Sequence, residues 1–517
     1  MRTNYLYAKV NNNVALMGVF MLKKEKIFGI MALLTVFSAL LSSDGITVGT
    51  EGVEATGWWN VDWKYRMPIK MEEKSGDTLT DYQVSVNVDT ALLIATGKMQ
   101  TNSADIRFTD FAGNEIPYWI ESGINTENTT IWVKVPQIPA LGTETIYMYY
   151  GNPTASNAAN ASAVFDFFDD FVGTELDVAK WTWRAVATSG GIPVQPGIGY
   201  VTVANSTVSV VSPNTDGWEQ ATELTTISNF TLPLVLEGNL SVPNWGGYGS
   251  AGWYRAAWGG LSDSNMSQGS SSMRHGVVFF LASENEYCPY VLDEGVSGYL
   301  SNYPDTPIDF HTYRAIWKTN STEFYRDGIY HEEVTTNVPK VSLPIWFLTS
   351  QWGGPGWPES RIDVDWVRVR KYAFPEPTCL LGSEEAFTDF SVHWEEETYH
   401  VTTISNSTIS DFEFNGTAIC FNVTGIDGTT GFCRICIPTA LMNDTYRVYV
   451  NSTEVPCTLL PESNTTHSHL YFTYNHSTQE VVIIPEFPSS LVLPLLMSFS
   501  LVAVVLSKKK RHQSKHR

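Results

Sequence analysis

The sequence predicts an all-β protein made of tandem β-sandwiches, and three observations support this fold class. Aromatic residues are abundant, with 17 Trp, 24 Tyr and 25 Phe, and 38 Gly and 25 Pro supply many turns. Short segments alternate between apolar and polar residues, which is the period-two pattern of half-buried strands. The length of 517 residues is sufficient for several domains.

The formal net charge of −22 at pH 7 argues against one class of partner. Nucleic-acid binding depends on patches of Lys and Arg that neutralise phosphates. We therefore expect no nucleic-acid partner. The basic residues that do occur in groups lie near the two ends of the chain, beside apolar runs, where they indicate membrane signals.

Residues 1–55 are predicted to be a signal peptide and leader. Three lysines between Lys23 and Lys26 precede the apolar run Ile27–Leu41. A basic flank followed by an apolar run of this length is typical of a secretory signal peptide. The sequence therefore predicts an exported protein.

Residues 485–517 are predicted to anchor the protein in a membrane. The apolar run Leu491–Leu506 is followed by the basic segment Lys508–Arg511, so we expect one transmembrane helix with a short cytoplasmic C-terminus. A buried core helix is the alternative. The preceding Pro485-Glu486-Phe487-Pro488 resembles the PEF-CTERM signal of archaeal surface proteins. That resemblance implies removal of the tail and its replacement by a lipid, and the fate of the tail stays open.

Residues 57–163 are predicted to form the first sandwich. They contain, in order, the motifs W-x-YR-x-PI from Trp63, PYWIE from Pro117 and IWVKVP from Ile131. This order resembles the domain of unknown function 2341 (DUF2341), a family of surface and secreted proteins of archaea and bacteria with no assigned chemistry. We interpret Trp119 as a core or interface residue and not as part of a site, because successive strand residues face opposite ways.

Residues 164–383 are predicted to form the central sandwich. Val164–Trp181 reads VFDFFDDFVGTELDVAKW and Arg361–Arg370 reads RIDVDWVRVR. These segments resemble the first and last strands of concanavalin-A-like lectin/glucanase domains, which implies a jelly roll. Within it, Glu323–Tyr330 contains an Asp-Gly pair between two alternating segments and is predicted to be a hairpin.

Residues 388–484 are predicted to form a third, immunoglobulin-like sandwich close to the membrane. The segments Glu413–Gly425 and Tyr446–Val450 alternate clearly. We interpret this unit as a stalk that holds the outer domains away from the membrane.

Six cysteines in an exported chain favour disulfide bonds, although their pairing cannot be deduced. Metal or redox chemistry at the Cys-x-x-Cys pair is the less favoured interpretation. The cysteines are Cys288, Cys379, Cys420, Cys433, Cys436 and Cys457.

Fourteen Asn-x-Ser/Thr sequons lie between Asn128 and Asn475 and are most frequent toward the anchor. We expect a glycoprotein, because such sequons are glycosylated in surface loops of exported chains. The alternative is the ordinary chemistry of loops rich in Asn, Ser and Thr.

The motif of a glycoside hydrolase is missing from the central unit. Glucanases of the related fold carry Glu-x-Asp-x-Glu on one strand, which places the nucleophile and the general acid on one face. Residues 164–383 contain no such motif; Ser283–Glu286 lacks the middle Asp, and Asp363 and Asp365 lie on the last strand. We therefore expect no enzyme, with a hydrolase kept as an alternative.

A structural calcium ion is the candidate cofactor. In the glucanase relatives the last strand contributes an Asp to such an ion, and Asp365 occupies that position. Asp169 or Asp170 could approach it from the first strand, and calcium accepts carboxylate and carbonyl oxygens together. The alternative is solvated or Arg-paired carboxylates.

Two glycine-rich segments with many aromatic residues are the candidate glycan-binding elements. Aromatic rings stack on the C–H face of a pyranose, and glycine lets the backbone approach a ligand. The alternative is that these rings fill the ends of the core. The residues are Trp245, Tyr248, Trp253, Trp258, Trp352 and Trp357.

Together these features predict a membrane-anchored cell-surface protein that binds cell-surface or environmental glycans through its central unit. One alternative is a structural or adhesive protein that packs against other cell-envelope proteins. The other is a glycoside hydrolase-like enzyme. The identity of the ligand, the oligomeric state and the role of the DUF2341-like unit stay open.

Overall fold

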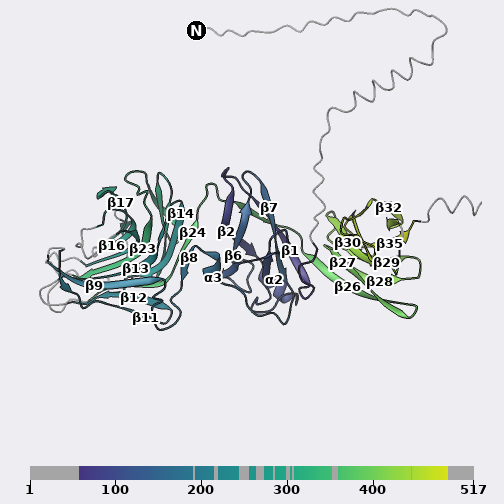
Figure 1. Ribbon diagram of the computed structural model, residues 1–517, viewed down its shortest axis with the longest axis horizontal. Helices are drawn as coiled ribbons and strands as arrows, with labels where there is room; N and C mark the ends of the chain where they lie inside the picture. The colour runs from purple at the N-terminus through teal and green to yellow at the C-terminus, as the bar shows by residue number, and fades with distance from the viewer. Residues whose placement is uncertain are drawn as a thin grey trace, which may run out of the picture. The chain divides into compact units, whose positions relative to one another are not determined.

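The computed structural model describes most of the chain from residue 57 to residue 486 and confirms the all-β class (Figure 1). Within these residues no helix is long and apolar enough to cross a membrane. The predicted signal peptide and the predicted transmembrane helix lie outside them. The described ranges are 57–189, 192–214, 219–243, 255–263, 273–282, 286–298, 303–304, 308–351, 359–443 and 445–486.

The first unit is a sandwich of two sheets around a core of apolar side chains such as Ile69, Val133 and Met148. One sheet has the order β2-β6-β5, and the other includes β1-β7-β3-β4. The elements are β1 (Tyr65–Glu72), β2 (Leu79–Val88), α2 (Thr90–Ala95), β3 (Arg107–Thr109), β4 (Glu115–Ile116), β5 (Tyr118–Ser122), β6 (Thr129–Ile138), β7 (Thr143–Tyr150) and α3 (Ala161–Val164).

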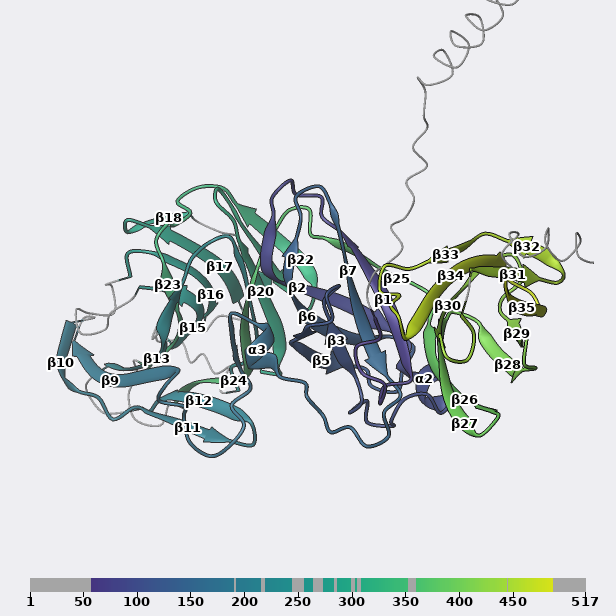
Figure 2. The same ribbon diagram turned by 45° about the vertical axis from the view of Figure 1, so that its right-hand side comes forward.

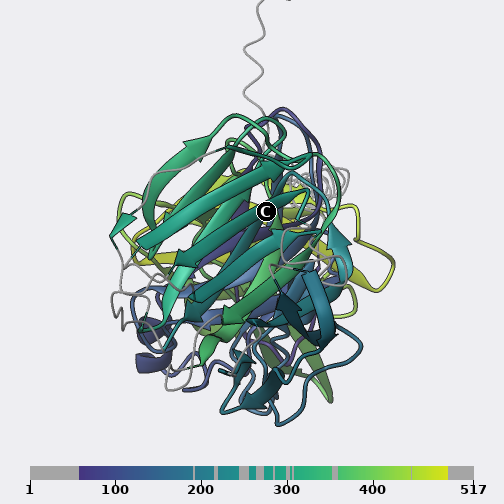
Figure 3. The ribbon, with the colours of Figure 1, turned by 90° about the vertical axis from the view of Figure 1, so that its left-hand side faces the viewer.

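The central unit is a larger sandwich, drawn in teal and green in Figures 1 and 3. Its elements are β8 (Phe167–Asp169), β9 (Trp181–Ser189), β10 (Ile192–Pro196), β11 (Tyr200–Ala204), β12 (Thr207–Ser212), β13 (Glu219–Phe230), β14 (Leu234–Ser241), β15 (Arg255–Ser262), β16 (Gly276–Ala282), β17 (Glu286–Asp293), β18 (Val296–Gly298), β19 (Tyr303–Pro304), β20 (His311–Trp317), β21 (Thr322–Arg326), β22 (Ile329–Val334), β23 (Leu343–Gln351) and β24 (Ser360–Lys371).

Two sheets enclose the core of this unit. Sheet D has the order β10-β9-β13-β23-β15-β16-β17-β18, and sheet C has the order β11-β12-β24-β14-β20-β21-β22. Large side chains including Trp181, Trp317 and Phe347 fill the space between them. The two segments that the sequence places at the ends of the domain pair directly, with Phe168 opposite Arg368 in β8 and β24.

The third unit is also a sandwich. Strands β28-β29-β35-β31-β32 form one sheet, and β33-β34-β30-β27-β26 form the other. Strand β25 (Thr378–Leu381) precedes this unit and pairs with β1. The elements of the third unit are β26 (Glu385–Trp394), β27 (Glu397–Ser405), β28 (Thr408–Phe414), β29 (Ile419–Thr424), β30 (Thr430–Pro438), β31 (Tyr446–Val450), β32 (Thr453–Val455), β33 (Cys457–Leu459), β34 (His467–Asn475) and β35 (Gln479–Pro485).

One strand lies in a different unit from the one that the sequence predicts. Strand β25 falls within the predicted central range 164–383, yet it pairs with β1 of the first unit (Figure 2). The side chains of Cys379 and Leu381 pack against the core of the first unit. Strand β1 also pairs with β26, so one sheet continues from the first unit into the third. The central sandwich is therefore an insertion between strands of the first unit.

Candidate functional site

A row of positions crosses the outer face of sheet D. In register, Arg184 of β9 is opposite Glu223 of β13, Glu223 is opposite Leu348 of β23, and Leu348 is opposite Trp258 of β15. Successive side chains of a strand point to opposite faces, and the next residue in β13, Leu224, belongs to the core between the sheets. Glu223 therefore lies on the outer face of sheet D. The row therefore runs from the Arg184–Glu223 ion pair to β15, the strand that carries the predicted glycan-binding residue Trp258.

Glu223 is the most constrained polar residue of this face. Its side chain forms an ion pair with the Arg184 guanidinium and accepts a hydrogen bond from Trp346 Nε1 at 3.2 Å, and the residue is only 4% exposed. Ala221, Val278 and Leu348 form an apolar cluster with Trp346 around it. A carboxylate in such surroundings keeps its charge only with a partner like Arg184. Sequence reasoning missed Glu223 because no glucanase motif surrounds it.

The two aromatic-rich segments adjoin neighbouring strands of sheet D in the sequence. Arg255, the first residue of β15, is paired with Gln351, the last residue of β23. The segment 244–254 leads into β15 and the segment 352–358 follows β23, so both join sheet D at this paired end. Gln351 is 1% exposed, and in the described part of the chain neither of its amide atoms has a hydrogen-bond partner. A buried amide without a partner marks a place for water or a ligand.

The side chains of all six predicted glycan-binding residues lie outside the part of the chain that the structure describes. The structure places the backbone of Trp258 in the middle of β15, opposite Leu348, and its side chain is not described. The other five residues lie outside the described ranges; they are Trp245, Tyr248, Trp253, Trp352 and Trp357.

The three predicted calcium ligands are not brought together as a ligand set. Among the described residues no three His, Cys, Asp or Glu side chains are grouped as metal ligands would be. Asp169 accepts hydrogen bonds from Trp181 Nε1 at 2.7 Å and from the Phe171 amide at 3.0 Å. Asp170 is exposed, and Asp365 accepts a hydrogen bond from Asn239 Nδ2 at 3.0 Å. The calcium ion stays a prediction.

The outer face of sheet C carries a second, denser group of charges. Arg368 donates from Nε to Glu237 at 2.7 Å and from Nη1 to Glu121 of the first unit at 2.6 Å. Trp132 Nε1 donates to the other oxygen of Glu121 at 2.8 Å. Burial by itself would raise the pKa of the Glu237 carboxyl, but Arg368 and Arg370 outweigh it and hold the pKa below its usual value. This face is covered by the first unit.

Aromatic side chains complete that junction. Trp119 packs against Phe165 and Phe168 with ring centroids 5.7 and 5.1 Å apart. The Arg368 guanidinium lies 5.0 Å from the centre of the Trp132 ring. This arrangement confirms the interpretation of Trp119 as an interface residue.

The prediction of disulfide bonds is wrong for this structure, in which none of the six cysteines forms one. The physical reason is clear for Cys433 and Cys457. Both are paired with Phe472, from opposite sides of β34, so a whole strand separates them. Two strand spacings amount to roughly 9–10 Å, which exceeds the reach of a disulfide. Cys436 instead lies 3.6 Å from His469 Nε2.

Comparison with known proteins bears on the first and central units. The family model described as a domain of unknown function (DUF2341) matches residues 102–184, which extends past the predicted boundary into β8 and β9. No curated protein matches the chain.

Solved structures resemble part of the chain at low identity. The endo-β-1,3-glucanase from Pyrococcus furiosus is 19% identical, covers 40% of this chain and 94% of its own, and has a TM-score of 0.31. The β-glucanase of Bacillus licheniformis is 14% identical, covers 40% of this chain and 98% of its own, and has a TM-score of 0.30. Because the identities and TM-scores are this low, the function of this chain has to be inferred from its own residues. The motifs that begin at Pro117 and Ile131 lie inside the matched residues 102–184, so the DUF2341 segment that they predict is confirmed.

Proposed function

We propose that this protein binds carbohydrate at the end of sheet D where β15 and β23 are paired. The register of Arg255 with Gln351 is the observation that carries the proposal. It means that two segments rich in Trp and Gly, far apart in the sequence, join the sheet on adjacent strands. Sequence signals for export and anchoring support a location on the cell surface.

The chemistry of this region suits a neutral or weakly polar sugar. Sugar sites combine aromatic faces with a few fixed polar groups. Trp352 and Trp245 belong to the two joining segments, and the buried amide of Gln351 lies at their junction. Glu223 and Arg184 supply a fixed charged pair on the adjoining face.

Binding without catalysis is the better account of Glu223. Hydrolysis needs two carboxyl groups about 5–10 Å apart. The next carboxylate on the same face of β13 is Glu219, four positions earlier, which is roughly 13 Å along a strand.

A glycan array probed with the full chain, with and without EDTA, tests the proposal. We expect saturable binding that Trp352→Ala weakens by about tenfold or more, since a stacked ring contributes on the order of 1–3 kcal/mol. Trp394→Ala is the matched control, because Trp394 is a 36% exposed indole in the third unit. Its binding should equal that of the wild type. Loss of binding in EDTA would add a metal ion to the site.

Two outcomes would replace this proposal. Absence of binding to every glycan would favour a structural or adhesive role in the cell envelope. Release of new reducing ends from a bound glycan, abolished by Glu223→Gln, would establish a hydrolase. If Trp352→Ala and Trp394→Ala weakened binding equally, the sugar would bind elsewhere.

A further inference from the structure

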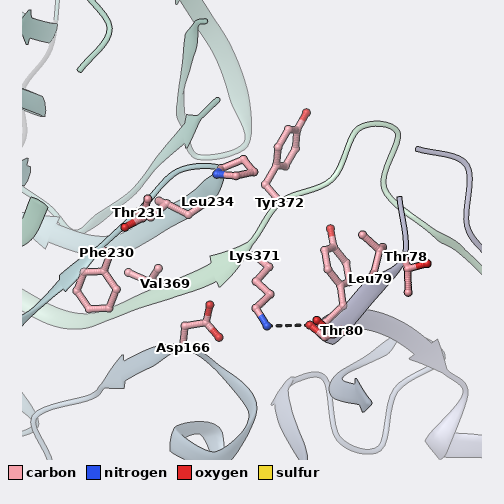
Figure 4. Close-up of a pocket in the computed structure, with 12 residues that line it drawn as sticks. Thr78, Leu79, Thr80, Asp166, Phe230, Thr231, Leu234, Val369, Lys371 and Tyr372 are labelled. Atoms are coloured by element: carbon pink, nitrogen blue, oxygen red, sulfur yellow. Dashed lines mark hydrogen bonds between the residues drawn. The ribbon is translucent and has the colours of Figure 1, made fainter. Parts of the chain in front are cut away.

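A groove of about 340 Å³ lies where the first unit meets the central unit (Figure 4). This volume is within the range of small-molecule sites. Its walls come from both units, and twelve residues line it: Thr78, Leu79, Thr80, Tyr82, Asp166, Phe230, Thr231, Pro233, Leu234, Val369, Lys371 and Tyr372.

Two charged side chains of opposite sign face the groove. Asp166 is exposed, and its Oδ1 accepts a hydrogen bond from Gln83 Nε2 at 3.1 Å. Its other oxygen has no partner among the described residues and is open to a donor. Lys371 Nζ donates to the carbonyl oxygens of Thr80 at 2.8 Å and Asp81 at 3.2 Å. An ammonium has three donors, so one remains for a ligand.

Hydroxyl groups add neutral donors and acceptors. Tyr82 accepts a hydrogen bond from the Ala373 amide at 3.2 Å, which leaves its own proton available. Burial raises the pKa of Tyr372, so this phenol stays protonated and can donate. The side chains of Thr78 and Thr80 also line the groove (Figure 4).

Apolar groups form the rest of the lining. Phe230, Leu234 and Val369 come from β13, β14 and β24 of the central unit, and Leu79 comes from β2 of the first unit. A ligand that fits must therefore offer C–H surface as well as many hydroxyls. One carboxylate and one ammonium leave the groove without a net charge, so neither a strongly anionic nor a strongly cationic ligand is favoured.

We propose that this groove binds a neutral, hydroxyl-rich ring, such as a monosaccharide or the terminal sugar of a glycan. The site is separate from the paired end of β15 and β23, and it does not depend on binding there. Because both units line it, the DUF2341-like unit supplies half of a binding site. The order of the chain explains how: Asp166 lies on the connection between the two units, and Lys371 ends the last strand of the insertion.

Saturation-transfer NMR and calorimetry on the full chain test this site, with glucose, galactose, N-acetylglucosamine and the anionic glucuronic acid as probes. We expect at least one neutral sugar to bind and glucuronic acid to bind more weakly. Asp166→Ala should weaken binding by about tenfold, because a charge-assisted hydrogen bond is lost. Tyr372→Phe removes a single hydroxyl and should weaken it by about threefold.

Controls separate this site from the proposed glycan site. Asp170→Ala removes an exposed carboxylate a few residues away and should leave the affinity unchanged. Trp352→Ala should leave the part of the binding that depends on Asp166 unchanged, because Trp352 does not line the groove. Binding that survives Asp166→Ala and disappears with Trp352→Ala would overturn the groove site while supporting the other one. No detectable binding of any neutral sugar at millimolar concentration would overturn it as well.

Discussion

The two outer faces of the central sandwich make an instructive comparison, since each holds a buried glutamate paired with arginine. On sheet C, Glu237 is paired with Arg368, and Arg368 continues to Glu121 of the first unit. On sheet D, Glu223 is paired with Arg184 and also accepts a hydrogen bond from the indole of Trp346 in the same sheet.

The two faces differ in which unit supplies the further partner of the glutamate–arginine ion pair. On sheet C a charge from another unit completes the network, so the ion pairs hold a junction together. On sheet D, Arg184 and Trp346 both belong to the sheet itself. Buried ion pairs contribute little net stability but strongly disfavour arrangements that leave one charge alone. The same kind of ion pair therefore fixes a junction between two units on one face and holds a buried carboxylate within a single sheet on the other.

The largest effect should come from breaking the network on sheet C. Arg368→Ala leaves Glu237 and Glu121 without their shared partner, and we expect a loss of about 3–5 kcal/mol in the free energy of unfolding. Urea unfolding followed by Trp fluorescence measures it. Arg274→Ala is the control, because the side chains of Arg274 and Glu294 are 65% and 66% exposed. Its loss should stay below about 1 kcal/mol. Equal losses would show that the junction is not held by Arg368.

A smaller effect is expected on sheet D. Arg184→Ala removes the cationic partner of Glu223, but the Arg184 side chain is 34% exposed and solvent can reach the site. We expect a loss of about 2 kcal/mol in stability, together with weaker glycan binding on the array. Arg361→Ala is the matched control, since its side chain is 37% exposed and pairs with Asp363 at 2.7 Å on the other sheet. Unchanged glycan binding in Arg184→Ala would remove this face from the site.

The smallest effect should appear on acidification. The pKa of Glu237 is lower in the folded protein than the usual value of about 4.3, because Arg368 and Arg370 favour the carboxylate. Its contribution to stability is therefore complete above about pH 4.3 and is lost as the pH falls through the folded-state pKa. Protonation leaves Arg368 paired with Glu121, so the loss should be smaller than in either substitution.

Urea midpoints measured from about pH 7 to about pH 3 test this dependence. Glu237→Gln cannot titrate at this position, so its midpoint should fall less steeply with acid than that of the wild type. Parallel curves would mean that another group governs the acid response of the junction.

The sequence by itself determined the local structure. Alternation of apolar and polar residues predicted the all-β class, and the Asp-Gly pair predicted the hairpin between β21 and β22, where Asp327 and Gly328 have φ of 49° and 76°. The motif order predicted the DUF2341 segment, and strand alternation predicted that Trp119 faces an interface. These features depend on neighbouring residues, whose backbone preferences and side-chain directions are readable from a short stretch of sequence.

Only the tertiary structure decided which faces meet. It paired β25 with β1 across the inserted sandwich, joined Arg368 to Glu121, and separated Cys433 from Cys457 by a strand. It also satisfied Asp169 with the indole of Trp181 and made Glu223 the buried carboxylate of sheet D. Alternation says which side chains share a face but not what covers that face, because the partner lies hundreds of residues away and is chosen by packing and charge together.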